Sequence, residues 1–277
     1  MRDFSLDIYR ELLETLQENG YRLIPFEEYC RDIKPSKPRE DDKYVILRHD
    51  VDKKPWNSLM AAQIEKSLDA KATYYFRVGK ESNVPEVIKA IVGLGHELGY
   101  HYEDMSLCKG DKRKAWSHFQ TWLDYFRQYY AVQTICMHGS PTSKWDAKDL
   151  WKKYDYKSLD IIGEPYLDTD FCDVFYLTDT GRCWDGYKVS VRDKIPQYQD
   201  EWTQKGWSWH TTPELIQAIE DGAFPKHVMM TTHPQRWLNN DIEWYLELVT
   251  QNAKKQGRYA HWRCCTFCNA KIWCRMG

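Results

Sequence analysis

Short apolar segments alternate with amphipathic stretches along most of this 277-residue chain. The segments are rich in β-branched and aromatic residues, which is typical of buried strands, and they span residues 44–47, 72–78, 96–102, 134–138, 175–179 and 227–233. Helical spacing of apolar residues lies around them, at residues 6–17, 58–68, 84–94, 116–129, 146–153, 212–219 and 240–254. Strands that alternate with helices of this length predict a parallel sheet, either an open sheet or a β/α barrel.

The segments follow one another without an internal repeat, so we expect a single domain over residues 1–277. This domain carries an N-terminal helical extension (1–40) and a cysteine-rich tail (261–277). The least regular part, roughly residues 155–210, is long for a connection and predicts loops over the functional face.

Charge and targeting signals narrow the expected partners and location. The net charge is −2 and the pI about 6.5, so neither a nucleic acid nor an anionic membrane is indicated as a partner. The N-terminus shows no apolar signal segment, and no run approaches the roughly 18 apolar residues of a membrane span. We therefore expect a cytoplasmic protein without an integral membrane segment; the sequence does not indicate its oligomeric state.

Nine cysteines, an odd number, favour reduced thiols. Cys265 and Cys268 form a CxxC pair that only Cys274 or His261 could complete as a zinc site, so free thiols remain the favoured interpretation of these cysteines.

The chain is rich in aromatic residues, with 13 Trp and 19 Tyr. Aromatic rings mainly fill cores, but at a surface they also stack on the apolar faces of sugars.

Histidines and carboxylates stand where the extended segments end, which is where functional groups collect in α/β folds. Asp50 and Asp52 share one face of an extended chain. Two such close carboxylates repel each other unless their roles differ, so we expect one to bind a cation and the other to act as a base. The further residues at strand ends are Arg48, His49, His101, Tyr102, Glu103, Asp104, His138, Asp179 and His233.

The histidines differ in their expected roles. His96 and His101 are five residues apart and so lie on opposite faces of a strand, which assigns His96 to the scaffold and His101 to the site. His101, His138 and His233 are expected to converge with the two aspartates. Imidazole and carboxylate ligands together suit zinc and other first-row divalent ions.

These motifs resemble the polysaccharide deacetylase family (carbohydrate esterase family 4), in the same order over roughly residues 44–237. The matching segments are Asp50-Val51-Asp52, GHELGYH (95–101) and VMMTTHP (228–234). The resemblance implies a distorted (β/α) barrel of about seven parallel strands. It also implies that Asp50 is the base, Asp52 and His101 are metal ligands, and His233 is the general acid.

The chain departs from the family pattern at two positions. Met105 stands where the family has a second metal-binding histidine, and Met is a poor ligand for such an ion. His138 stands where the family has an arginine that contacts the base. Either the third ligand is relocated or the site holds no metal. We favour His138 as the third ligand, then Glu103, which shares a face with His101, and last Asp104.

The resemblance implies a metal-dependent deacetylase that hydrolyses the N-acetyl group of a sugar, with zinc, cobalt or nickel as cofactor. The lack of an export signal favours a precursor of a surface polysaccharide, such as O-antigen or capsule, as substrate. Two alternatives are a metal-free, non-catalytic carbohydrate-binding protein on the same fold and an amidohydrolase acting on a non-sugar amide. The residues expected to contact the sugar are Tyr102, Trp184 and Trp237 by stacking, and Asp179, Arg182 and Asp185 through its hydroxyls.

Overall fold

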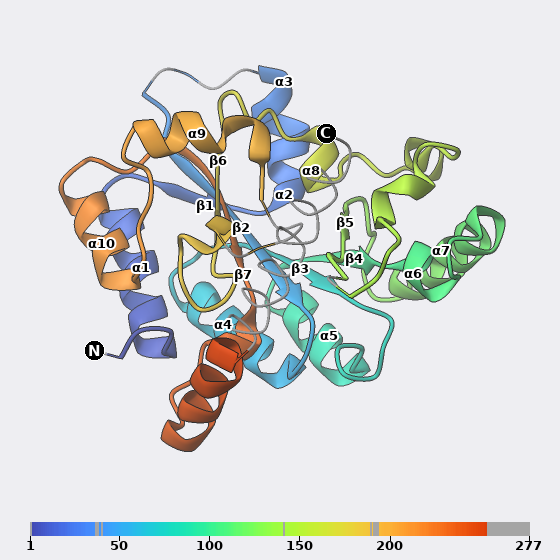
Figure 1. Ribbon diagram of the computed structural model, residues 1–277, viewed down its shortest axis with the longest axis horizontal. Coiled ribbons are helices and arrows are strands. Elements are labelled where there is room, and N and C mark those ends of the chain that lie inside the picture. The colour runs from blue at the N-terminus through green and yellow to red at the C-terminus, as the bar shows by residue number, and fades with distance from the viewer. Residues whose placement is uncertain are drawn as a thin grey trace, which may run out of the picture.

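Seven parallel strands form one sheet in the order β5-β4-β3-β2-β7-β6, with β1 beside β2 (Figure 1). The structure is a computed structural model and describes residues 2–36, 39, 41–140, 142–188, 190 and 194–253. The cysteine-rich tail predicted for residues 261–277 lies outside this range. The strands are β1 (Arg22–Ile24), β2 (Tyr44–Val51), β3 (Thr73–Phe76), β4 (Glu97–Tyr102), β5 (Ile135–Met137), β6 (Phe175–Thr178) and β7 (His227–Thr232).

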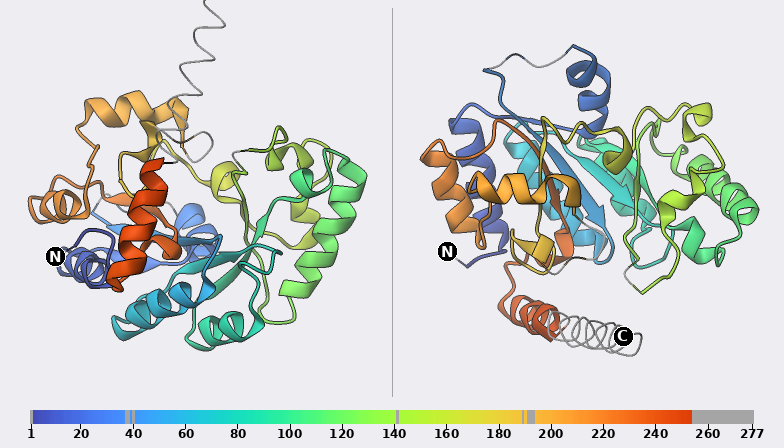
Figure 2. Two further views of the ribbon diagram at one scale, coloured as in Figure 1. Left: turned by 60° about the horizontal axis from the view of Figure 1, so that its bottom comes forward. Right: turned by 45° about the horizontal axis from the view of Figure 1, so that its top comes forward.

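The sheet is curled into a half-barrel, and the predicted distorted (β/α) barrel is confirmed (Figure 2). All six predicted strands are present. The seventh, β1, escaped prediction because three residues are too few to show a pattern. Among the described residues, β5 and β6 form the two open edges.

Strand β2 is the centre of the sheet. Along one edge it pairs with β7 over residues 44–49, and its other edge is shared by β1 over residues 44–46 and β3 over residues 48–51. All eight of its residues are buried. It runs four residues beyond the predicted end at Leu47, so Arg48 to Val51 belong to the strand itself.

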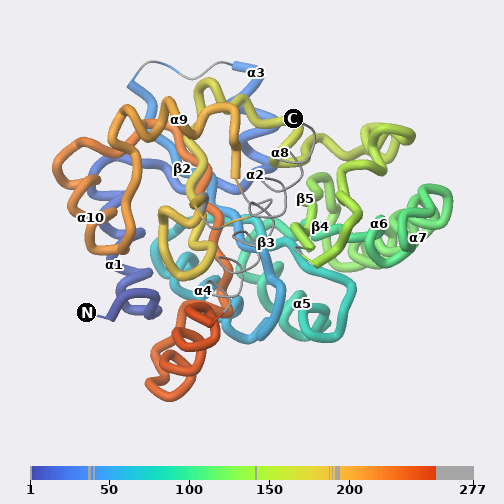
Figure 3. The backbone as a smooth tube through the Cα atoms, viewed as in Figure 1, coloured from blue at the N-terminus to red at the C-terminus, as the bar shows by residue number. Residues whose placement is uncertain are grey.

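Helices cover the outside of the half-barrel. Helix α1 packs against both α10 and α4, and α4 packs against α5 (Figure 3). The longer helices are α1 (Leu6–Glu18), α4 (Pro55–Ser67), α5 (Pro85–Gly93), α7 (Lys112–Phe126), α9 (Pro196–Gln204) and α10 (Thr212–Glu220), and residues 241–253 are also helical. The short ones are α2 (Phe26–Glu28), α3 (Lys34–Ser36), α6 (Asp104–Leu107) and α8 (Pro165–Asp168).

Some sequence expectations need correction. The helix expected at 146–153 is a single 3-10 turn, Ala147–Leu150. Helix α10 is capped by Thr211, which forms a capping box with Glu214, one residue earlier than expected. Residues 1–40, expected as a helical extension, also supply β1 to the sheet. Among the described residues we find no helix with both the length and the apolar character needed to cross a bilayer.

Successive side chains of β2 point to opposite faces of the sheet, and the face away from Asp50 carries a buried polar cluster. His49 Nε2 lies 2.6 Å from Glu65 Oε1 of α4. The hydroxyls of Tyr9 and Tyr74 donate to the same carboxylate at 2.5 and 2.7 Å. Although burial opposes the charge of Glu65, the adjacent His49 outweighs it and lowers the pKa of Glu65. This cluster therefore joins α1, α4, β2 and β3 behind the site.

Gly99 of β4 lies against the ring of Tyr75 on β3. A Cβ atom at Gly99 would lie 2.2 Å from Tyr75 Cε1 and 3.1 Å from the Thr134 carbonyl oxygen, whereas one at Gly93 of α5 would meet nothing within 4 Å. We expect Gly99→Ala to lower the free energy of unfolding by about 1–3 kcal/mol through overpacking. Gly93→Ala should leave it unchanged or raise it by roughly 0.5–1 kcal/mol. Urea unfolding measures both, and equal effects would contradict this account.

Candidate metal centre

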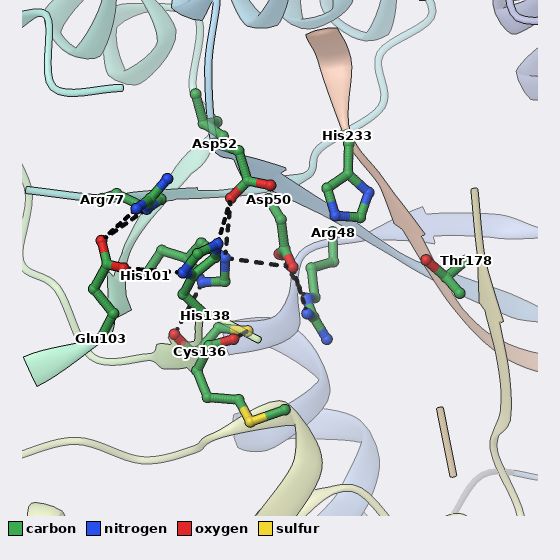
Figure 4. A network of polar contacts seen from close by, with 12 residues as sticks. Arg48, Asp50, Asp52, Arg77, His101, Glu103, Cys136, His138, Thr178 and His233 are labelled. Carbon is green, nitrogen blue, oxygen red and sulfur yellow. Dashed lines mark hydrogen bonds and ion pairs between the residues drawn. The ribbon is translucent and has the colours of Figure 1, made fainter. Parts of the chain in front are cut away.

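The predicted site residues meet at the C-terminal ends of the central strands. Asp50, Asp52, His101, His138 and His233 line one cavity of about 380 Å³ (Figure 4). They come from β2, β4, β5 and β7 or from the first residues after these strands. The convergence expected from the position of these residues at strand ends is therefore present in the fold.

Asp52, His101 and His138 offer three ligand atoms that lie within 4.8 Å of one another. Asp52 Oδ1 is 3.7 Å from His101 Nε2 and 3.4 Å from His138 Nε2. Ligands of a tetrahedral zinc ion, each about 2.0–2.1 Å from the metal, stand roughly 3.3 Å apart. Asp52 Oδ1 is also buried, and no described residue forms a hydrogen bond with it. A divalent cation would satisfy this oxygen, so the three residues fit a metal.

The rear nitrogen of each imidazole has an acceptor that orients the ring. His101 Nδ1 lies 3.0 Å from the carbonyl oxygen of Cys136, to which it can donate. His138 Nδ1 lies 3.1 Å from Glu103 Oε2. His101 Nε2 then lies 3.6 Å from Asp50 Oδ2 and 3.7 Å from Asp52 Oδ1, and His138 Nε2 lies 3.4 Å from Asp52 Oδ1. Both Nε2 atoms are thus left for a metal. Burial lowers the pKa of His101 to about 4, which keeps its ring neutral.

Glu103 and Asp104, the other candidates for the third ligand, are occupied elsewhere. Glu103 supports His138 from behind and binds Arg77, whose Nε and Nη2 lie 2.8 and 2.7 Å from Glu103 Oε1. Asp104 is buried and accepts from the hydroxyl of Tyr100 at 2.9 Å. The geometry favours His138 as the third ligand.

The sequence places Arg48 at a strand end without assigning it a role, and in the structure it binds Asp50. It donates to Asp50 through Nε at 3.0 Å and Nη2 at 2.7 Å, and both side chains are buried. Burial alone would raise the pKa of Asp50, but Arg48 outweighs it and holds that pKa well below its ordinary range. Arg48 and Asp50 both belong to β2, so the guanidinium and the carboxylate that it binds come from one strand. The sequence signal for this contact is the spacing of two residues, which places Arg48 and Asp50 on the same face of an extended strand.

His233 is paired with Asp179, which follows the neighbouring strand β6. His233 Nδ1 lies 2.6 Å from Asp179 Oδ1, and the backbone N–H of His233 donates to Oδ2 at 2.9 Å. Burial and the nearby Arg236 oppose protonation of His233, but the Asp179 carboxylate outweighs them and raises its pKa. Because Nδ1 is held by Asp179, Nε2 is the nitrogen left for the cavity.

The predicted sugar contacts are wrong in most cases. Tyr102, Trp184 and Trp237 are at most 3% exposed and belong to the hydrophobic core, so they cannot stack on a ligand. Asp179 is fully buried with its oxygens engaged by His233, Trp237 and Arg236, and cannot bind sugar hydroxyls.

Arg182 is also unsuited to sugar binding, because its guanidinium lies 4.4 Å from the centroid of the Trp244 ring and donates to the Trp244 carbonyl. None of these five residues lines the cavity that holds Asp50. Its walls instead include Lys53, Lys54, Arg77 and Tyr166, which the sequence did not single out.

Comparison with known proteins gives distant structural similarity alone. No family model matches the sequence, and no curated protein matches it. Similar solved structures include the Streptococcus pyogenes deacetylase PplD in complex with acetate, at 19% identity and TM-score 0.41, covering 56% of this chain and 67% of that one. IcaB from Ammonifex degensii has 15% identity and TM-score 0.40, with 52% and 70% covered.

A carbohydrate esterase family 4 pseudoenzyme from Bacillus anthracis is also similar, at 13% identity and TM-score 0.43, with 79% of this chain and 63% of that one covered. At such values the chemistry of this chain has to be argued from its own residues.

Substitutions at His138 and Glu103 distinguish a metal ligand from a residue that only orients it. We expect His138→Ala to weaken zinc binding more than Glu103→Gln, which should cost about 10–100-fold because it removes only an orienting acceptor. Calorimetric titration of metal-free protein with Zn²⁺ measures both, with the exposed Glu86→Gln on α5 as an unchanged control. Stronger loss in Glu103→Gln than in His138→Ala would identify Glu103 as the ligand instead.

Proposed function

We propose that this chain is a metal-dependent deacetylase that hydrolyses the N-acetyl group of a sugar. One observation carries the proposal. An ionised Asp50, the Asp52–His101–His138 group and His233 line one cavity, and Asp179 holds His233 from outside it. Figure 4 shows Asp50 between the imidazoles of His101 and His138 and that of His233. Amide hydrolysis needs a base, a group that stabilises the oxyanion and an acid in such an arrangement.

Asp52, His101 and His138 are the residues that would hold the cofactor, which we propose to be zinc, with cobalt or nickel as substitutes. When bound, such an ion polarises the amide carbonyl and lowers the pKa of water toward neutrality. Asp50, kept ionised by Arg48, accepts the proton of the attacking water. Arg48 thus sets the charge of the base without touching the substrate.

His233 donates the proton that the leaving group needs. An amine departs poorly as an anion, so it must be protonated as the carbon–nitrogen bond breaks. Asp179 favours the imidazolium form of His233 and holds the ring through Nδ1. Nε2 therefore carries the proton to the sugar nitrogen.

The cavity also bears on the class of substrate. Its volume is near the lower end of the range for small-molecule pockets, which suits a sugar residue more than a long chain. Lys53 lines it and would complement a phosphate, whereas Lys54 and Arg77 are paired with Glu243 and Glu103. We therefore propose a phosphate-linked precursor of a surface polysaccharide, such as O-antigen or capsule, acted on in the cytoplasm.

Removal of the base tests the reaction. We expect Asp50→Asn to lower acetate release from phosphate-linked N-acetylhexosamines by about 10²–10⁴-fold, because the attacking water loses its proton acceptor. Metal content should persist, since Arg48 engages both oxygens of Asp50 and the group formed by Asp52, His101 and His138 stays intact. Asp41→Asn, at an exposed position, serves as control. Full turnover in Asp50→Asn would refute the assigned base, and release from non-sugar amides alone would favour the alternative amidohydrolase.

The dependence of kcat on pH tests the acid. As the acid, His233 must be protonated, so activity is lost as pH rises through its pKa. Asp179 raises that pKa. Asp179→Asn removes the stabilising charge, so the alkaline limb should move to lower pH. Asp173→Asn provides a matched control because Asp173 pairs with His227 at the other end of β7. An alkaline limb that stays in place in Asp179→Asn would exclude His233 as the acid.

A further inference from the structure

A second group of ligand-type side chains lies outside the cavity. Cys183, Asp185 and His210 offer a sulfur, an oxygen and a nitrogen atom that are all within 4.8 Å of one another. Cys183 and Asp185 belong to the segment TDTGRCWDG (178–186) after β6, and His210 precedes α10. Cys183 is 3% exposed and lines none of the described cavities, so it has no access to a substrate.

The backbone holds the two segments together without help from these side chains. The N–H of Trp184 donates to the carbonyl of His210 at 3.1 Å. A parallel bridge joins Asp185 to Thr178, the last residue of β6. The Trp184–His210 hydrogen bond therefore joins the two segments, and the bridge to Thr178 anchors Asp185 within the first of them.

The ligand atoms of His210 and Asp185 are in direct contact, and the Cys183 sulfur lies within 4.8 Å of both. His210 Nδ1 lies 2.8 Å from Asp185 Oδ1, while Lys188 Nζ binds the other carboxylate oxygen at 2.8 Å. Cys183 Sγ donates weakly to the Thr180 carbonyl at 3.5 Å. An ordinary ion pair between Asp185 and His210 does not require a buried thiol beside it, whereas a metal site does use one.

Thiolate, imidazole and carboxylate are the three ligand types of zinc in proteins. Ligands about 2.0–2.3 Å from a tetrahedral zinc stand roughly 3.3–3.6 Å apart, which small side-chain movements within this group can reach. We propose that Cys183, Asp185 and His210 form a second divalent metal site that takes zinc, with water in the fourth position. Binding converts the Cys183 thiol to a thiolate and releases its proton to solvent.

Such a site would act on the structure and not on the reacting atoms. Its first segment contains Asp179, which holds His233, and its second segment leads into α10. A metal that joins the two segments would restrain the loop that carries Asp179. The site is independent of the Asp52–His101–His138 group, so each can fail without the other.

Cobalt substitution distinguishes the two sites, because a thiolate bound to Co²⁺ gives an intense charge-transfer absorption that imidazole and carboxylate ligands do not. We would strip the full-length chain of metal, add Co²⁺ and record spectra of wild type, Cys183→Ser, His210→Gln and the control Cys172→Ser, which alters an exposed thiol. Cysteines in the tail are present in all four proteins, so difference spectra isolate Cys183.

We expect Cys183→Ser to lose charge-transfer absorption and one metal ion per chain by elemental analysis, and His210→Gln to lose metal at the same site. Cys172→Ser should match wild type, and His138→Ala should lose an ion while keeping this absorption. His210 is exposed, so its variant tests the site even where Cys183→Ser folds poorly. If Cys183→Ser and His210→Gln retain the wild-type metal content and spectrum, the proposal is refuted.

Discussion

The buried ion pair of Arg48 and Asp50 is the interaction on which the site depends. Asp50 and Asp52 point into the same cavity, and two such close carboxylates would force one to take up a proton unless positive charge separated them. Arg48 binds Asp50 with two hydrogen bonds, which leaves Asp52 to the imidazoles of His101 and His138. Burying an ion pair rarely stabilises a fold, so this pair is better explained by the charge that it keeps on Asp50.

Each imidazole of the site is supported from behind by a group on another segment. His101 is held by the carbonyl of Cys136, His138 by Glu103, and His233 by Asp179. These supports fix which ring nitrogen faces the cavity, so each imidazole is already oriented before a ligand binds. His138, the residue that follows β5, brings a second imidazole to Asp52.

The alternation of strands and helices and the convergence of Asp50, His101 and His233 could be predicted. The first follows from local patterns, and the second from the rule that parallel strands end at one edge. The role of Arg48 could not be predicted, because it depends on β2 continuing to Val51 and not ending at Leu47. The contact between Asp179 and His233 joins residues 54 positions apart through the pairing of β6 with β7. The expected stacking of Trp184 and Trp237 on a sugar is not found, because residue type alone does not show whether an aromatic ring lies in the core or at the surface.

The two faces of β2 carry different polar groups, and this restricts which sequence changes the strand can accept. Arg48 and Asp50 belong to one face, and His49, bound to Glu65, belongs to the other. Insertion or deletion of one residue exchanges the faces of a strand, which would turn His49 into the cavity and press Asp50 against the buried Glu65. Changes of side chain can accumulate along β2, but changes in its length cannot, so homologues should align across this strand without gaps.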